Sequence, residues 1–166
     1  MPSDPMSGHG ERVDDATSAH DLLAAIERRT TPHRSGKRIA LDCSDCDPSL
    51  VFHADGRTVE RILFSLVADA ANFSRPDGRI TVSTALLSRE VAAFIVTDSG
   101  IGMTVDELAV LFEPVARRGA PLADDADDEL PMPACRQLAR SIGGDLVATS
   151  RPDVGSAFTL VLPLAH

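Results

Sequence analysis

The chain has 166 residues, of which 43% are hydrophobic and 25% charged, enough for one domain with a packed core. A net charge of −9 and the absence of Trp and Tyr argue against a nucleic-acid partner, which needs basic side chains or aromatic stacking platforms. No apolar run reaches the length of a membrane span, and no secretory segment stands at the N-terminus. A cytoplasmic protein with no membrane partner is therefore expected.

The three cysteines, Cys43, Cys46 and Cys135, lack the spacing of a disulfide framework and fit a reducing compartment. The run Cys43-Ser-Asp-Cys46 has no second Cys/His pair at zinc spacing. We interpret it as a strand end followed by a turn, with a metal or redox role as the lesser alternative.

The first part of the chain is predicted to contain a leader, one helix and two strands. Residues 1–18 are rich in Pro, Gly, Ser and charge, which is typical of a disordered leader. Apolar residues on one side predict a short helix over His20–Arg29, with a loop over Thr30–Lys37. Strands are predicted over Arg38–Cys43 and Leu50–His53.

The clearest helix of the sequence follows. Its apolar residues step by three and four, as expected of a helix facing a core; they are Val59, Ile62, Leu63, Leu66, Val67, Ala70 and Phe73. Beside this stripe runs a polar row at positions i, i+4 and i+7, formed by Ser65, Asp69 and Asn72. A polar row next to a buried face indicates a rim that meets a ligand, with an ordinary solvated face as the alternative.

Two strands then lead to the most conspicuous motif. They are predicted over Arg79–Leu87 and Val91–Asp98, and the second is almost wholly apolar, as in a strand buried on both faces. Asp98 ends it, followed by Gly100 and Gly102. Glycines after a strand-end carboxylate allow the backbone to approach a ligand closely, although a plain turn has the same signature.

The last third is predicted to contain two helices, a loop and a hairpin. Thr104 begins a capping box that opens a short helix to about Leu111. Residues 117–131 are predicted to form a mobile surface loop, and Ala134–Ile142 a helix that ends at two glycines. The remaining predicted elements are the hairpin strands Asp145–Thr149 and Ser156–Leu162.

Four motifs in this order resemble those of the ATP-binding catalytic domain of sensor histidine kinases, in the GHKL superfamily with the Bergerat fold. RTVERILFSLVADAANFSRPDGRITV resembles the asparagine box, VTDSGIGM the first glycine box, LFEPV the phenylalanine box, and CRQLARSIGGDLVATSRPDVGSAFTLVLPL the closing helix and hairpin. The resemblance covers about residues 20–164 and implies an α+β fold. It implies a two-layer α/β sandwich over 19–166, with a mixed, mostly antiparallel sheet of about five strands, about three helices on one face, and a lid loop at about 104–131.

The resemblance also implies where a nucleotide would bind. The family's strand-end Asp accepts a hydrogen bond from the adenine amino group, which implies that Asp98 recognises the base of ATP or ADP beside Gly100, Gly102 and Met103. The family's magnesium-ligating Asn falls on Asp69, which is thereby the implied ligand of Mg²⁺. The other implied nucleotide contacts are Ser65, Asn72, Phe112, Leu130 and Thr159.

The phosphate half departs from the family pattern. Asp69 and Ser65 stand where the family has Asn, and Asn72 stands where it has a basic residue. The second glycine box is replaced by the acidic run 127–131, in which Pro131 removes a backbone donor that could cradle phosphate. Carboxylates at this point repel a triphosphate by about 1 kcal/mol for each close contact.

The expected function is an adenine-nucleotide-binding domain of the two-component histidine kinase type. If active, it would transfer the γ-phosphate weakly to a His on another domain or chain, with a phosphoacceptor-His domain or a response regulator as partner. Two alternatives remain: a non-catalytic, pseudokinase-like interaction module, and a free-standing anti-sigma-type Ser/Thr kinase.

Overall fold

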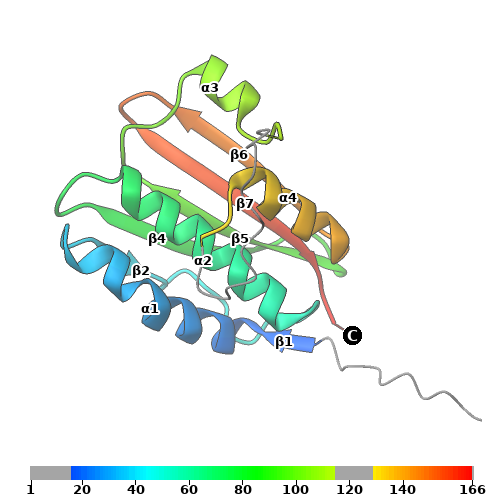
Figure 1. The fold of residues 1–166 in the computed structure, drawn as a ribbon. Coiled ribbons are helices and arrows are strands. Elements are labelled where there is room, and N and C mark those ends of the chain that lie inside the picture. Colours follow the sequence, from blue (N-terminus) through cyan, green and yellow to red (C-terminus); the bar gives the residue numbers. More distant parts are fainter. Residues whose placement is uncertain (1–15, 115–128, 166) are drawn as a thin grey trace, which may run out of the picture.

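A computed structural model describes residues 16–114 and 129–165 of the chain. Its elements, in chain order, are β1 (Ala16–Ser18), α1 (Ala19–Ser35), β2 (Ala40–Asp42), β3 (Val51–His53), α2 (Gly56–Phe73), β4 (Arg79–Leu86), β5 (Val91–Asp98), α3 (Val105–Val110), α4 (Met132–Ser141), β6 (Asp145–Arg151) and β7 (Gly155–Pro163). They form two layers, with α1, α2 and α4 covering one face of the main sheet and the short α3 lying beside β6 (Figure 1).

The main sheet has five strands in the order β2-β4-β5-β7-β6. Only the pair β2–β4 is parallel, and the other three pairs are antiparallel. The α+β fold predicted above, with its mixed and mostly antiparallel sheet, is confirmed. Within the described ranges, no helix is both long and apolar enough to cross a membrane.

The N-terminal prediction needs two corrections. Ala16–Ser18 form β1, which pairs with β3 in a small antiparallel sheet, so these three residues belong to the fold and not to a leader; residues 1–15 lie outside the described residues. The predicted loop Thr30–Lys37 is instead the second half of α1, which continues through Pro32 to Ser35. Packing of α1 along α2 outweighs the local proline signal, because Thr30 is fully buried there.

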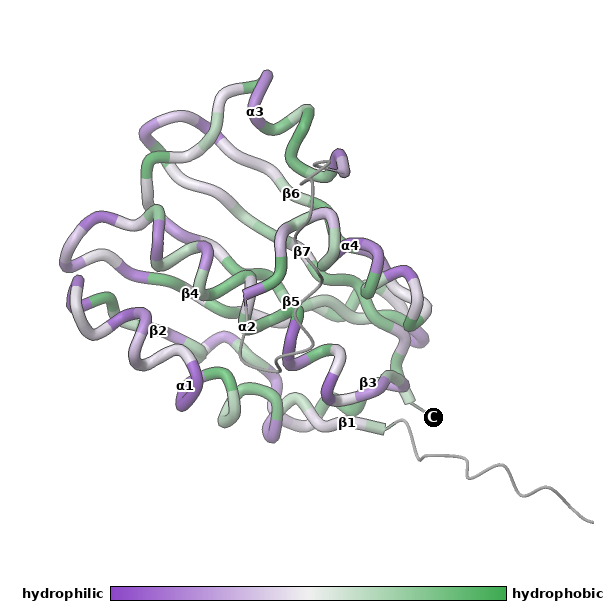
Figure 2. Tube along the Cα trace, viewed as in Figure 1, coloured by the Kyte–Doolittle hydropathy of each residue, from purple (hydrophilic) through white to green (hydrophobic). Residues whose placement is uncertain are grey.

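Helix α2 buries the predicted apolar stripe. Six of its seven residues are buried, and the seventh, Phe73, is 52% exposed because the helix ends there. The carbonyl groups left open at this end accept hydrogen bonds from the Lys37 ammonium, at 2.8 Å for Asn72 and 3.1 Å for Ser74. Figure 2 shows hydrophobic and hydrophilic blocks alternating along α1, as expected of a helix that buries one side against this core.

Strand β5 lies in the middle of the sheet, between β4 and β7. Its even-numbered residues face the helices, where Phe94 packs on Phe52 with 4.9 Å between the ring centroids. Because side chains alternate along a strand, Asp98 points to the same helix-covered side as Phe94. The central strand therefore delivers its terminal carboxylate to the space between the helical layer and the sheet.

Candidate functional site: a nucleotide-type site at the end of the central strand

Asp98 is a largely buried carboxylate at the end of β5, with 7% of its surface exposed. Its Oδ1 accepts a hydrogen bond of 2.9 Å from the backbone N–H of Gly100. Burial raises the pKa of Asp98, while backbone hydrogen bonds from Gly100 and Ser156 oppose that rise. No basic side chain within residues 16–114 and 129–165 shifts this pKa, so the carboxylate keeps its capacity to accept a further hydrogen bond from a ligand.

The glycine motif after Asp98 is held between the end of α2 and the β6–β7 hairpin. A Cβ on Gly100 would collide with the carbonyl oxygen of Phe73, and one on Gly102, at φ +66, would collide with that of Arg151. Only glycine fits both contacts, and Gly102 also needs the left-handed region. The backbone N–H of Met103 donates a 2.7 Å hydrogen bond to Ser150 Oγ, which fixes the start of the following segment.

Two serines that the sequence reasoning missed complete this end of the site. Ser156 is paired with Asp98 across β5 and β7, and its side chain is buried. Its Oγ lies 2.8 Å from Ser150 Oγ. Side chains alternate between the two faces of β7, so Ser156 points to the same face as the buried Phe158. This alternation is the sequence signal that could have identified Ser156.

Thr159, predicted as a nucleotide contact, is not brought to this cluster. It lies opposite Ile95 of β5 and Val147 of β6. Since its neighbours Phe158 and Leu160 are buried on the helical side, the alternation of β7 turns Thr159 to the other face of the sheet. The position of Thr159 in the family motif suggested a nucleotide contact, but the alternation of β7 places its side chain on the opposite face of the sheet from Asp98.

The polar row of α2 meets the segment Glu129–Pro131, which precedes α4. The backbone N–H of Leu130 donates a 2.8 Å hydrogen bond to Ser65 Oγ, which itself donates to the carbonyl oxygen of Arg61 at 2.9 Å. The Asn72 amide nitrogen lies 3.4 Å from Glu129 Oε2. Leu130 is buried in the core cluster. Ser65 and Asn72 thus bind a segment of the chain itself.

Three carboxylates interact across this contact. Burial, followed by the charges of Glu129 and Asp98, raises the pKa of Asp69 to about 6. Burial also raises the pKa of Glu129, against the opposing effects of His33 and Asn72. The charge at this point is therefore negative, and it lies along the α2 row that the resemblance assigns to phosphate and Mg²⁺.

The start of α4 offers few donors to an anion. Pro131 is its N-cap and makes no side-chain capping bond, and Pro133 stands in the first turn. Prolines lack the backbone N–H groups with which helix N-termini bind phosphate. The N–H of Leu130 is already directed to Ser65. Residues 115–128 of the predicted lid loop, with Asp127 and Asp128, lie outside the described residues.

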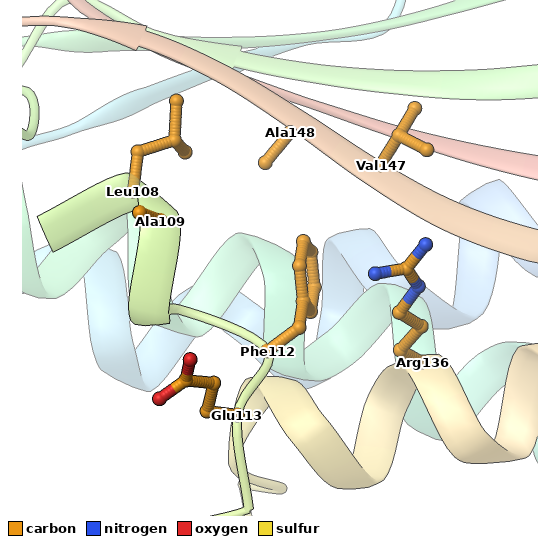
Figure 3. A pocket seen from close by; sticks show the side chains of 7 residues that line it. All are labelled: Leu108, Ala109, Phe112, Glu113, Arg136, Val147 and Ala148. Carbon is orange, nitrogen blue, oxygen red and sulfur yellow. The ribbon is translucent and has the colours of Figure 1, made fainter. Parts of the chain in front are cut away.

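A pocket of about 400 Å³ lies between α3, α4 and β6 (Figure 3). Of the predicted site residues only Phe112 lines it, beside Arg136, whose guanidinium carbon lies 5.0 Å from the centre of the Phe112 ring. Figure 3 shows both side chains pointing toward Val147 and Ala148 of β6. Asp98 is not among the lining residues, so this pocket is separate from the carboxylate cluster.

The fit of a magnesium nucleotide differs between its two parts. Asp98, with the glycine motif and Ser156, suits a base that donates a hydrogen bond. Asp69 could give Mg²⁺ one oxygen, which fits an ion that takes one or two carboxylates and completes its shell with phosphates and water. No group of three or more His, Cys, Asp or Glu that could hold a metal ion occurs within residues 16–114 and 129–165. Phosphate groups bound along α2 would lie beside carboxylates and prolines, which do not suit an anion.

Comparison with known proteins places the fold and the motifs in one family. Residues 54–166, more than half of the chain, match the family model described as histidine kinase-, DNA gyrase B- and HSP90-like ATPase. The chain therefore belongs to this family.

Curated relatives include sensor proteins. The sensor protein EvgS of Escherichia coli O157:H7 is 27% identical over 135 residues, 78% of this chain and 11% of EvgS. The aerobic respiration control sensor protein ArcB of Escherichia coli K12 is 32% identical over 113 residues, 65% of this chain and 14% of ArcB. The chain thus spans only a small part of the curated relatives it matches.

Solved structures share the fold. The mycobacterial sensor histidine kinase MprB has a TM-score of 0.70 at 22% identity, covering 92% of this chain and 98% of that one. Full-length ShkA in complex with AMPPNP has a TM-score of 0.71 at 21% identity, covering 90% and 31%. ThkA in complex with the response regulator TrrA has a TM-score of 0.72 at 16% identity, covering 90% and 41%.

Proposed function

We propose that this chain binds ATP or ADP as a histidine-kinase-type domain, with Asp98 accepting a hydrogen bond from the adenine amino group. The observation that carries the proposal is a desolvated strand-end carboxylate without a basic partner among the described residues, beside a loop that only glycines can form. A buried carboxylate that can accept a further hydrogen bond favours a base that brings a donor over one that does not. The ATP analogue in the ShkA complex supports this assignment by analogy of fold.

The phosphate side is proposed to bind weakly. In the described conformation Leu130 bonds to Ser65 and Glu129 lies beside Asn72, so phosphates bound along α2 would have to displace this segment. Mg²⁺ held by Asp69 would offset part of the repulsion from Asp69 and Glu129. The consequence is a domain that holds the base more firmly than the triphosphate.

Phosphotransfer, if it occurs, is proposed to go from the γ-phosphate to a His on another domain or chain. The partner would be a phosphoacceptor-His domain or a response regulator, a proposal supported by the complex of ThkA with TrrA. Positioning and charge compensation supply most phosphoryl-transfer catalysis, so the acidic segment should slow the transfer more than it weakens adenine binding. Three free cysteines support a cytoplasmic location.

A second function is favoured by the contact between Glu129–Pro131 and α2. A domain whose phosphate side is filled by its own chain could act as a non-catalytic interaction module that regulates a two-component kinase or response regulator. Burial of Leu130 in the core cluster supports this alternative, because removing it to admit phosphates has a cost.

Titration calorimetry with adenosine, ADP and ATP, each with and without Mg²⁺, separates the two functions. The nucleotide-binding proposal expects binding of all three ligands, with a gain from Mg²⁺ only for those that carry phosphates. If none of the three ligands gave binding heat at millimolar concentration, the nucleotide-binding proposal would be wrong and the interaction module would be the remaining function. A radiolabel transfer assay from ATP to isolated phosphoacceptor-His domains then tests catalysis directly.

A further inference from the structure

Cys43 and Cys46 form a close thiol pair at the end of β2, far from the carboxylate cluster in the chain. They are the first and fourth residues of a turn closed by a 3.2 Å hydrogen bond from the Cys46 N–H to the Cys43 carbonyl oxygen. Such a turn brings its end Cα atoms within about 7 Å, and disulfides span about 4.4–6.8 Å between Cα atoms. The backbone already has a geometry that a disulfide can close.

The turn is anchored to β4 rather than left free in solvent. The Thr84 N–H donates to the Asp45 carbonyl oxygen at 3.3 Å, and the Asp47 N–H donates to Thr84 Oγ1 at 2.8 Å. Both cysteine side chains pack against the edge of the core and remain half-buried. The pair is thus held in place and still within reach of a small reagent.

The two thiols differ in character. Cys46 Sγ donates a 3.0 Å hydrogen bond to the carbonyl oxygen of Val82, and the Cys43 side chain is its neighbour across the turn. The neighbouring Cys46 side chain lowers the pKa of the Cys43 thiol, and the Cys43 side chain in turn raises the pKa of Cys46. A thiol of lowered pKa next to a second thiol is the arrangement of a nucleophilic cysteine with a resolving partner.

The charged groups around the pair decide which reagents it favours. Glu27 of α1 and Asp42 oppose ionisation of Cys43, and Arg34 of α1 favours it. Asp42 and Asp45 likewise oppose ionisation of Cys46, because their negative charges raise the pKa of its thiol. Acidic groups therefore outnumber basic ones here, which favours a neutral or cationic reagent over an anionic one.

We propose that Cys43 and Cys46 are a reversible dithiol–disulfide site that reacts with low-molecular-weight neutral or cationic disulfides. The Cys43 thiolate attacks one sulfur of the reagent, breaking its S–S bond and releasing one thiolate, which takes a proton from water. Cys46 then loses its proton to water and attacks Cys43 Sγ in the mixed disulfide, releasing the second thiolate. Two protein thiols are oxidised to one disulfide, and the reagent disulfide is reduced to two thiols.

The test uses the full chain at neutral pH with hydroxyethyl disulfide as a neutral reagent, followed by acid quenching, alkylation and peptide mass spectrometry. The peptide containing both residues should lose two hydrogens, carry no adduct, and return to the dithiol on adding dithiothreitol. In Cys46→Ser the adduct should remain on Cys43. Adduct formation on Cys43 in Cys46→Ser should be at least about tenfold faster than adduct formation on Cys46 in Cys43→Ser. A tenfold ratio is what a difference of about one pKa unit gives in the fraction of thiolate. The matched control Cys135→Ala removes the buried cysteine and should leave the conversion unchanged.

Wild-type alkylation provides a measurement that does not depend on the folding of variants. Under limiting iodoacetamide, Cys43 should be labelled about tenfold faster than Cys46. Equal labelling rates, faster labelling of Cys46, or adducts on both residues without an internal disulfide would each overturn the proposal. Replacing hydroxyethyl disulfide by cystamine should raise the rate of oxidation, and a lower rate would contradict the charge argument.

Discussion

The two ends of the proposed nucleotide site are built in opposite ways. At the base end, Asp98 is held by backbone donors, and the following glycines fit against the carbonyl groups of Phe73 and Arg151. At the phosphate end, Ser65 and Asn72 are occupied by Glu129–Pro131 and surrounded by carboxylates. The base end is rigid and has kept its acceptor, whereas the phosphate end is filled by the chain itself. Backbone contacts thus fix the geometry of the base end, whereas the proposed phosphate end is engaged by another segment of the same chain.

The largest expected effect comes from removing the base acceptor. Asp98→Asn should weaken adenosine, ADP and ATP alike, by tenfold to a hundredfold, because a charged buried hydrogen bond is worth about 1.5–3 kcal/mol. Calorimetry on the three ligands measures this. Asp153→Asn, an exposed carboxylate in the hairpin turn, is the matched control and should bind like the wild type. If Asp98→Asn bound all three ligands normally, the base end would have no role in recognition.

The rigidity of the base end is tested by its glycines. Gly102→Ala should lower the free energy of unfolding by about 1–3 kcal/mol, because Gly102 has φ +66 and its Cβ would meet the Arg151 carbonyl oxygen. Urea denaturation gives the value. Gly36→Ala is the control, since Gly36 has φ −63 and open space around it, and it should be neutral or slightly stabilising. Equal stability of the two variants would show that the glycine loop is not strained.

The pH dependence of stability reports on the carboxylates at the phosphate end. The pKa of Asp69 is raised from 3.8 to about 6, so between these values the folded state holds more protons than the unfolded state. The free energy of unfolding therefore falls as pH rises through this window and stays lowered above it. Asp69→Asn should make this slope shallower, with Asp98 and Glu129 keeping a smaller part of it, and raise stability at neutral pH by roughly 1–2 kcal/mol in magnesium-free buffer. Urea titrations across the window measure both, and a slope unchanged in Asp69→Asn would assign it to other groups.

Local patterns predicted much of the fold and of the base end. The apolar stripe of α2 and the apolar run of β5 carry their own periodicity, and Asp98 with its glycines stands directly after that run. The loop predicted over Thr30–Lys37 was wrong, because local patterns give no weight to the packing of α1 on α2. Thr159 was chosen from motif position, where the alternation of β7 would have pointed to Ser156.

The phosphate end could not be predicted in full, because its decisive contact is long-range. Leu130 and Ser65 are 65 residues apart in the chain, and nothing near either residue announces the hydrogen bond between them. The substitutions at Ser65, Asp69 and Asn72 indicated a changed phosphate side. The structure shows that Glu129–Pro131 contacts Ser65 and Asn72 of α2. A phosphate bound along α2 would have to compete with this contact.

The smallest expected effect tests that competition. Glu129→Gln removes a charge that contributes to the raised pKa of Asp69 and keeps a side chain able to bond to Asn72. ATP should bind about threefold to tenfold more tightly and adenosine equally well, since one close like-charge contact is worth about 1 kcal/mol. The control Glu90→Gln changes an exposed carboxylate in the β4–β5 turn, at the opposite end of β5 from Asp98, and should bind both ligands like the wild type. A similar gain for adenosine and ATP in Glu129→Gln would place the segment away from the phosphates, and the contrast between the two ends would then rest on the α2 substitutions alone.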